Sequence, residues 1–222
     1  MPSFQGEEAT NYDERISRLV PGYELLHQLT QAQCQAQLSS SASILVVGAG
    51  TGKEVVALAK ANPNMHFVAQ DISADMLAIA EQRFDEAGIS ARVTCHCGDI
   101  GQLKQQFDGA LCLLVLHFLA DNGDKAALLK SIRQQLVPQA WLWLADLMKP
   151  ETQFERDAQF IACQQLGLSD AGVERMRHNL EHEFYPLDRM RLAELLEQCG
   201  YGIARCYFKA LGFTGYAIRC QS

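Results

Sequence analysis

The feature that most constrains the fold is a regular alternation of short apolar runs with longer amphipathic stretches, which begins at residue 44. The first run, Ile44-Leu45-Val46-Val47, contains no polar residue and ends at Gly48, as expected for a parallel strand that is buried on both faces. Strands separated by helices indicate βαβ units with right-handed crossovers and a parallel sheet. The same pattern predicts further strands at 66–69, 91–95, 109–114 and 141–145, and helices at 52–61, 74–87 and 124–136.

The rhythm changes after the fifth predicted strand. Residues 150–185 carry two helical stretches and more charge than their surroundings, and they are interpreted as an insertion. After a helix at 188–199, strands at about 202–208 and 212–219 are joined by so short a loop that they must pair antiparallel. The predicted organisation is a helical segment at 1–43, a core at 44–149, a helical insertion at 150–186, and a closing helix and strand pair at 187–222.

Composition limits the classes of function. Of the 222 residues, 48% are hydrophobic and 20% are charged, which is typical of a globular chain with a sizeable core. The 26 acidic and 19 basic residues give a net charge of −7, which argues against nucleic-acid binding through phosphate neutralisation. No apolar run is long enough to cross a bilayer, so no membrane partner is expected. The first residues lack a signal-peptide pattern and several of the eight cysteines fit small buried positions, so a cytoplasmic location is predicted.

The strongest indication of a binding site is the glycine-rich turn Gly48-Ala49-Gly50-Thr51-Gly52, directly after the first predicted strand. Glycines at such a turn allow positive φ angles and a close approach of the backbone to a ligand. The third glycine of a dinucleotide-binding G-x-G-x-x-G motif would fall on Lys53, and a P-loop needs Ser or Thr where Glu54 stands. The spacing G-x-G-x-G therefore fits neither phosphate-binding motif.

Two aspartates follow the next two predicted strands. Asp71 ends the second strand, where its carboxylate can accept hydrogen bonds from both hydroxyls of a ribose bound across the strand ends. Asp99 follows the third strand and can accept from the exocyclic amine of an adenine, with Ile100 packing on the ring. The alternative for both is a helix cap, although Ser73 is the better cap candidate after Asp71. Cys95-His96-Cys97 is interpreted as a strand end, and no metal site is predicted.

With these residues in place, the chain resembles the class I S-adenosylmethionine-dependent methyltransferases from about residue 12 to its end. The resemblance implies an α/β fold with a Rossmann-like, seven-stranded, mostly parallel sheet, an antiparallel last strand, helices on both faces, and S-adenosylmethionine as cofactor. The family usually has an acidic residue where this chain has Val46. The implied cofactor contacts are Gly48, Ala49, Gly50 and Gly52 with the methionine part, Asp71 with the ribose, Ile72, Met76, Asp99 and Ile100 with the adenine, and Leu114 at the fourth strand.

A narrower resemblance, at both ends of the chain, is to the carboxy-S-adenosylmethionine synthases, which serve wobble-uridine modification in tRNA. It implies that Tyr23 and Arg177 approach the cofactor. The chain departs from that family in a more glycine-rich loop and in Leu113, where those enzymes have asparagine. The same plan of N-terminal helix and insertion also serves small-molecule methyltransferases. The similar segments are Tyr12-Asp13-Glu14-Arg15-Ile16, Val20-Pro21-Gly22-Tyr23, the stretch from Arg175 to Glu181, and Gly212-Phe213.

In methyl transfer the protein mainly positions the methyl donor and the acceptor, because the cofactor is already activated. A poorly nucleophilic acceptor also needs a general base. His117, just past the fourth strand, is the candidate base, and its alternative is a structural histidine bonded to the backbone. The candidate substrate-binding residues are Tyr12, which could close over the cofactor with Tyr23, Asp146 at the tip of the fifth strand, and Arg177. Their plainer alternatives are a packing residue for Tyr12, a solvated loop carboxylate for Asp146 and a solvated helix face for Arg177.

The sequence thus predicts an S-adenosylmethionine-dependent methyltransferase that acts on a small, partly apolar acceptor, with the 150–186 insertion as a helical lid. Apolar residues in that segment, such as Phe160 and Phe184, favour such an acceptor. Two alternatives stay open: conversion of the cofactor to its carboxylated form or modification of tRNA, and a cofactor-binding module without turnover. The expected partner is the small-molecule acceptor, and a homodimer is compatible with the sequence.

Overall fold

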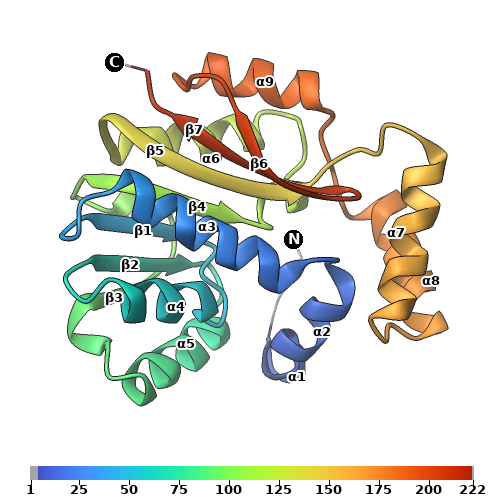
Figure 1. Cartoon of the computed structure of the whole chain (residues 1–222), viewed down its shortest axis with the longest axis horizontal. Coiled ribbons are helices and arrows are strands. Elements are labelled where there is room, and N and C mark those ends of the chain that lie inside the picture. The colour runs from blue at the N-terminus through green and yellow to red at the C-terminus, as the bar shows by residue number, and fades with distance from the viewer. Residues whose placement is uncertain (1–4, 222) are drawn as a thin grey trace.

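The computed structural model describes residues 5–221, which form one mixed sheet flanked by helices (Figure 1). Within these residues the sheet has seven strands in the order β3-β2-β1-β4-β5-β7-β6, and β7 runs antiparallel to both of its neighbours. The predicted fold class, a mostly parallel sheet with an antiparallel last strand, is confirmed. The strands are β1 (Ser43–Val47), β2 (His66–Asp71), β3 (Val93–Cys97), β4 (Phe107–Leu113), β5 (Leu136–Leu147), β6 (Arg205–Ala210) and β7 (Phe213–Arg219).

Helices cover both faces of the sheet. Helices α3, α4 and α5 pack on one face, and α6 and α9 pack on the other. Helices α7 and α8 lie side by side beyond one end of the sheet (Figure 1). The helices are α1 (Glu7–Thr10), α2 (Tyr12–Leu19), α3 (Tyr23–Gln37), α4 (Lys53–Ala61), α5 (Ala74–Glu86), α6 (Asp124–Gln134), α7 (Gln153–Gln165), α8 (Asp170–His182) and α9 (Arg189–Gln198), with short 3-10 turns η1 (Ser90–Arg92), η2 (Ile100–Gln102) and η3 (Leu116–Phe118).

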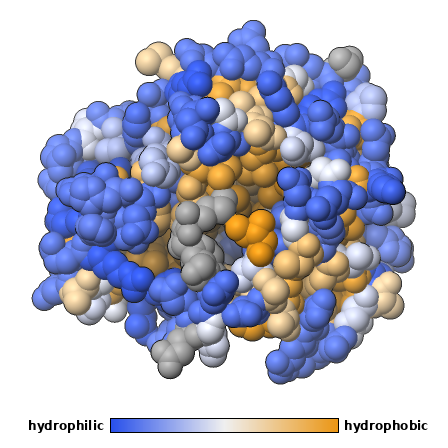
Figure 2. Space-filling view, turned by 180° about the vertical axis from the view of Figure 1, so that it is seen from behind, coloured by the Kyte–Doolittle hydropathy of each residue, from blue (hydrophilic) through white to orange (hydrophobic). Residues whose placement is uncertain are grey.

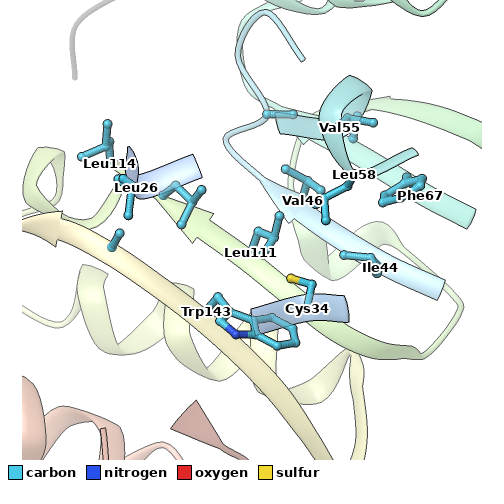
Figure 3. Close-up of a cluster of buried hydrophobic side chains, with 14 of the residues drawn as sticks. Leu26, Cys34, Ile44, Val46, Val55, Leu58, Phe67, Leu111, Leu114 and Trp143 are labelled. Atoms are coloured by element: carbon cyan, nitrogen blue, oxygen red, sulfur yellow. The ribbon is translucent and has the colours of Figure 1, made fainter. Parts of the chain in front are cut away.

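The alternation of side chains along the buried strands explains why β1 reads as an unbroken apolar run. Ile44 and Val46 belong to the core beneath α3, α4 and α5, whereas Leu45 and Val47 belong to the core beneath α6 and α9. Figure 3 shows the first of these cores, in which Leu26 and Leu58 from two helices meet side chains of the sheet. A strand covered on both faces has no position for a polar side chain.

The boundaries of the predicted elements shift by a few residues. The largest difference is in β5, which begins at Leu136 rather than at 141. Leu136 pairs with Phe107, and regular pairing with β4 resumes at Trp141. Pro138 lies in the irregular stretch between these points, where its missing N–H removes no ladder hydrogen bond. The helix predicted at 124–136 ends at Gln134 in the structure.

The segment that was interpreted as an insertion leaves and rejoins the core at neighbouring points. Met148 and Leu187 form an isolated parallel bridge, and the Lys149 N–H donates to the Leu187 carbonyl at 2.8 Å. Between them, α7 and α8 form a small core of their own around Phe160, Cys163, Val173 and Met176. Within the part of the chain that the structure describes, no helix is long and apolar enough to span a membrane.

Replacement of Gly52 by alanine is expected to destabilise the fold. Gly52 has φ +74°, and a Cβ added there would lie 2.5 Å from Cε1 of the buried Phe84. Gly88 is a matched control, because it has φ +68° and a Cβ there would meet nothing within 4 Å. Both variants carry the backbone cost of about 1–3 kcal/mol, and overpacking adds about 1–3 kcal/mol to Gly52→Ala alone. Urea unfolding should show this difference, and equal losses for the two variants would contradict it.

Candidate cofactor and acceptor cavities

The glycine loop is held by hydrogen bonds from the end of β2. Gly48, Gly50 and Gly52 all have positive φ angles, of +65°, +51° and +74°. Asp71 Oδ2 accepts from the Gly50 N–H at 2.8 Å, and Asp71 Oδ1 accepts from the Ser73 N–H at 2.9 Å. The helix cap of α5 is Ser73, whose side chain accepts from the Met76 N–H, as predicted. Asp71 therefore braces the loop, and each of its oxygens keeps a second lone pair for a ligand.

The largest cavity of the site, about 460 Å³, lies at the carboxyl ends of the parallel strands; we call it the strand-end cavity. This is where open α/β sheets bind their ligands. On the face opposite to that of Figure 1, a hollow with hydrophobic walls opens among hydrophilic residues (Figure 2). The structure brings these predicted cofactor-binding residues to the strand-end cavity: Gly48, Gly50, Asp71, Ile72, Met76, Asp99, Ile100 and Leu114.

Asp99 has the local role that was its stated alternative. Its side chain caps the turn η2 and accepts from the Gly101 N–H at 2.6 Å. The residue still lines the strand-end cavity beside the buried Ile100. A carboxylate can accept at both oxygens, so this cap leaves capacity for a ligand.

One wall of the strand-end cavity was missed from the sequence. It is formed by α6, whose lining residues follow a helical spacing that marks one face. That spacing was the available signal, but nothing in the sequence says which face of α6 meets the cavity. The missed residues are Asp124, Ala127, Leu128 and Ser131.

A second cavity of about 170 Å³ lies between α2, α8 and the sheet; we call it the apolar cavity. Its walls are mostly aliphatic and aromatic, and among its charged residues Glu8 pairs with Arg175 at 2.9 Å and with Arg15 at 3.8 Å. A largely apolar cavity with a few polar groups is typical of a site for a small organic molecule. Representative apolar residues are Ile16, Leu19, Met176, Phe184 and Phe213.

His117 lines the apolar cavity and is paired with Asp146. Its Nδ1 lies 2.6 Å from Asp146 Oδ1, and the two residues are only 5% and 3% exposed. The ring packs against Phe118 and Phe184, with centroid distances of 4.0 and 5.0 Å. Because a carboxylate can only accept a hydrogen bond, Nδ1 carries the proton that is donated to Asp146. The backbone below is also held, because buried Lys125 donates from Nζ to the Leu116 carbonyl at 2.6 Å.

The expectations for Asp146 and Arg177 need correction. Asp146 neither faces the cavity mouth nor lies in solvent; it is buried in β5 behind His117. Arg177 lines none of the cavities described here, because its guanidinium packs over Phe160, 3.9 Å from the ring centroid. Helix geometry explains this, since two positions along α8 from the cavity-lining Arg175 turn a side chain to the opposite face. A substrate contact by Arg177 is not supported by this geometry.

A third cavity, of about 20 Å³, lies beside the glycine loop; we call it the loop cavity. The predicted residues Tyr23 and Ala49 line it, together with Glu54, which the sequence reasoning did not select. Gly52 lines none of the three cavities, because its Cα faces the packed ring of Phe84. Its predicted contact with the cofactor is replaced by a contact between the loop and α5.

Two residues join the three cavities. Tyr12 from α2 and Leu114 from the end of β4 line all of them. Leu114 has φ +60°, a conformation that is rare for a residue with a branched side chain, and its N–H donates to the Ala145 carbonyl at 2.7 Å. Backbone strain of this kind is concentrated at functional sites. The backbone of Leu114 is thus held in place where the cavities meet.

Helix α2 is attached to the core next to the glycine loop. Asp13 accepts from Thr51 Oγ1 at 2.7 Å and from Arg83 Nη2 at 2.5 Å, and Arg83 also donates to the Thr51 carbonyl at 3.0 Å. The Gly6 N–H donates to Asp75 at 2.9 Å. These bonds hold the wall that carries Tyr12 over the cavities.

The strand order, the antiparallel β7, the glycine loop after β1 and the acid at the end of β2 together define the Rossmann-like class of S-adenosylmethionine-binding folds. Residues 45–142 match the family described as a methyltransferase domain. This match and the relatives below support the predicted class, an S-adenosylmethionine-dependent methyltransferase, and the predicted cofactor.

Relatives agree with this class. The carboxy-S-adenosyl-L-methionine synthase of Ruthia magnifica subsp. Calyptogena magnifica is 24% identical over 223 residues, which cover 96% of this chain and 92% of that protein. The demethylmenaquinone methyltransferase of Lactiplantibacillus plantarum is 30% identical over 145 residues, which cover 64% of this chain and 60% of that protein.

Solved structures share the fold. The magnesium protoporphyrin IX methyltransferase of Synechocystis PCC 6803, with bound SAH, superposes with a TM-score of 0.68 at 18% identity, covering 90% of this chain and 84% of that one. The mitomycin 7-O-methyltransferase superposes with a TM-score of 0.64 at 22% identity over 87% of this chain. This chain spans 54% of the length of the mitomycin enzyme, about half.

Proposed function

We propose that the protein transfers the methyl group of S-adenosylmethionine to a small, partly apolar molecule bound in the apolar cavity. The observation that carries this proposal is the junction at Tyr12 and Leu114, where the strand-end cavity meets the apolar cavity. A donor on one side of this junction and an acceptor on the other would be held in contact.

The residues present fit the cofactor. The strand-end cavity has the volume of a typical cofactor site, and the oxygens of Asp71 offer acceptors to two ribose hydroxyls. When bound, S-adenosylmethionine supplies a methyl group that is already activated for in-line displacement. The protein's part is then to orient the acceptor and to exclude water.

The histidine–aspartate pair supports an acceptor that must lose a proton, such as a hydroxyl group. His117 Nε2 would take that proton as a general base, while Asp146 orients the ring and stabilises the charged imidazolium. Phe118 and Phe184 pack against the ring and against each other, which keeps water away from that part of the ring. Asp146 acts through His117 and is therefore a positioning residue.

Filling the apolar cavity is the experiment that tests this proposal. Met176→Trp places an indole ring where α8 meets the apolar cavity and should exclude the acceptor. Turnover of a hydroxyl-bearing aromatic acceptor should fall at least tenfold. The affinity for S-adenosylmethionine should stay unchanged, because Met176 does not line the strand-end cavity. Met190→Trp, at a 77% exposed position on α9, is the matched control. The measurements are S-adenosylhomocysteine release with a panel of acceptors and calorimetry with the cofactor. Full turnover in Met176→Trp would place the acceptor elsewhere.

A second candidate is synthesis of a carboxylated cofactor. It is supported by the relative from Ruthia magnifica, which covers nearly the whole chain, and by Arg15 and Arg175 at the apolar cavity, since arginine suits a carboxylate. Mass spectrometry of the ligand released from the purified protein separates the two functions. Carboxy-S-adenosylmethionine would favour this candidate, whereas a methylated small molecule formed on turnover would favour methyl transfer.

We also propose a cytoplasmic location and a small-molecule partner rather than nucleic acid. The net charge of −7 supports the second point, because phosphate binding needs a basic surface. Fractionation of cells that produce the protein and a filter-binding assay with tRNA at low salt would test the two statements.

A further inference from the structure

The loop cavity has a chemical character of its own. It has room for one group the size of a water molecule or an ammonium ion. It shares Gly48, Gly50, Leu113 and Leu114 with the strand-end cavity, so a ligand can extend from one into the other around the glycine loop. The side chains that give it polarity are Tyr12, Tyr23, His27 and Glu54.

Glu54 brings a carboxylate to the loop cavity. It is the second residue of α4, directly after the glycine loop. Its neighbour Lys53 is paired with Glu24, and no ion pair to Glu54 is found among residues 5–221. Burial, together with the charges of Asp13 and Asp71, raises the pKa of Glu54 to about 7. A carboxylate in such a place is stabilised by an incoming positive charge.

His27 is the second observation that points to a polar ligand group. Both of its ring nitrogens are buried without a hydrogen-bond partner, and its ring packs edge-on against Tyr23 at a centroid distance of 4.4 Å. Burial lowers the pKa of His27 to about 4, so the ring is neutral at physiological pH and does not neutralise Glu54. Buried polar groups are nearly always hydrogen-bonded, so the cavity wall has capacity that a ligand would satisfy.

We propose that Glu54 binds the α-ammonium group of S-adenosylmethionine in the loop cavity. Val46, two residues before the first glycine of the loop, offers no charge and is buried in the core beneath α3, α4 and α5. Glu54 supplies the negative charge from the other side of the glycine loop. Asp71 would hold the ribose on one side of the loop, and Glu54 the amino-acid end on the other. This assignment rests on the cofactor and is independent of which acceptor is methylated.

The test compares two ligands on matched variants. S-adenosylhomocysteine carries the amino-acid end, and 5′-methylthioadenosine keeps the adenosine without it. By calorimetry, Glu54→Gln should weaken S-adenosylhomocysteine roughly 10- to 100-fold, the range of a charge-assisted hydrogen bond, and leave 5′-methylthioadenosine unchanged. Glu197→Gln removes the same charge from an exposed residue of α9 that lines none of the three cavities, and it should change neither affinity.

The experiment distinguishes a wrong role for Glu54 from a wrong assignment of the cofactor. Equal weakening of both ligands in Glu54→Gln, or no weakening of either, would overturn the role of Glu54. Failure of the wild-type protein to bind either ligand would instead overturn the cofactor assignment on which this proposal rests. Thermal melting of Glu54→Gln checks that the variant is folded.

The pH dependence provides an independent readout. Because the pKa of Glu54 is raised to about 7, its carboxyl is largely protonated at pH 6 in the free protein and must ionise to pair with an ammonium group. The affinity of S-adenosylhomocysteine should therefore rise between pH 6 and pH 7.5, and Glu54→Gln should lose this rise; an identical pH profile in both proteins would contradict the proposal. The other titratable or charged groups around the loop cavity are Tyr12, Asp13, Tyr23, Glu24, His27, Lys53, Asp71 and Arg83.

Discussion

Asp71→Ala is expected to abolish measurable binding of S-adenosylmethionine. Its carboxylate is predicted to accept from two ribose hydroxyls, and hydrogen bonds to a charged group contribute about 1.5–3 kcal/mol each. Loss of both weakens binding by roughly 10²- to 10⁴-fold. The variant also removes the acceptor of the Gly50 N–H and so loosens the glycine loop. Calorimetry with S-adenosylmethionine at a fixed pH is the direct measurement.

A control for the loss of loop bracing is available in the same sheet. Asp108, at the opposite end of the parallel strands, also accepts from a backbone N–H, that of Ser43, at 2.8 Å. Asp108→Ala should leave cofactor affinity unchanged while it costs a comparable backbone hydrogen bond. Asp71→Asn keeps one carbonyl oxygen and should bind the cofactor with intermediate affinity. Wild-type affinity in Asp71→Ala would show that the ribose is bound elsewhere.

His117→Asn is expected to lower turnover by about 10²- to 10⁴-fold, the usual contribution of a general base. Asparagine is the informative replacement, because its amide can still donate to Asp146, whereas alanine would leave that carboxylate buried and unpaired at a cost of about 3–5 kcal/mol. S-adenosylmethionine affinity should be unchanged, since His117 does not line the strand-end cavity. Steady-state kinetics and calorimetry measure the two effects.

Three readouts distinguish a base from a structural histidine. Added imidazole should restore part of the turnover of His117→Asn. Asp146→Asn should lower turnover but keep some activity when no imidazole is added, because His117 is still present and only loses its orientation. His66→Ala, at an exposed position that starts β2, should behave as wild type. Full activity in His117→Asn would assign the residue a purely structural role.

The parts of the fold that could be predicted from the sequence depend on local patterns. The apolar run of β1 is followed directly by the glycine loop, and Asp71 lies two residues before the Ser73 cap, so each of these two turns is marked by a short stretch of sequence. The short link between β6 and β7 likewise determined an antiparallel pair. Local chemistry therefore predicted the strand-end cavity well.

The parts that could not be predicted depend on contacts between distant segments. His117 and Asp146 meet because β4 and β5 are neighbours in register, with Leu113 opposite Ala145, and no local pattern states that register. Arg175 lines the apolar cavity where Arg177 was predicted to contact the substrate, and this difference depends on which face of α8 packs on α7. Such choices are made by tertiary packing and not by the periodicity of one helix.

Tyr12 has a thermodynamic consequence, because it is a wall of both large cavities and is held there by the Asp13 attachment of α2. The two binding equilibria share one structural variable, the position of this helix. By linkage, if the first ligand changes the affinity for the second by some factor, the second ligand changes the affinity for the first by the same factor. The sign of the coupling measured between the two ligands would therefore report whether α2 closes or opens when the first ligand arrives.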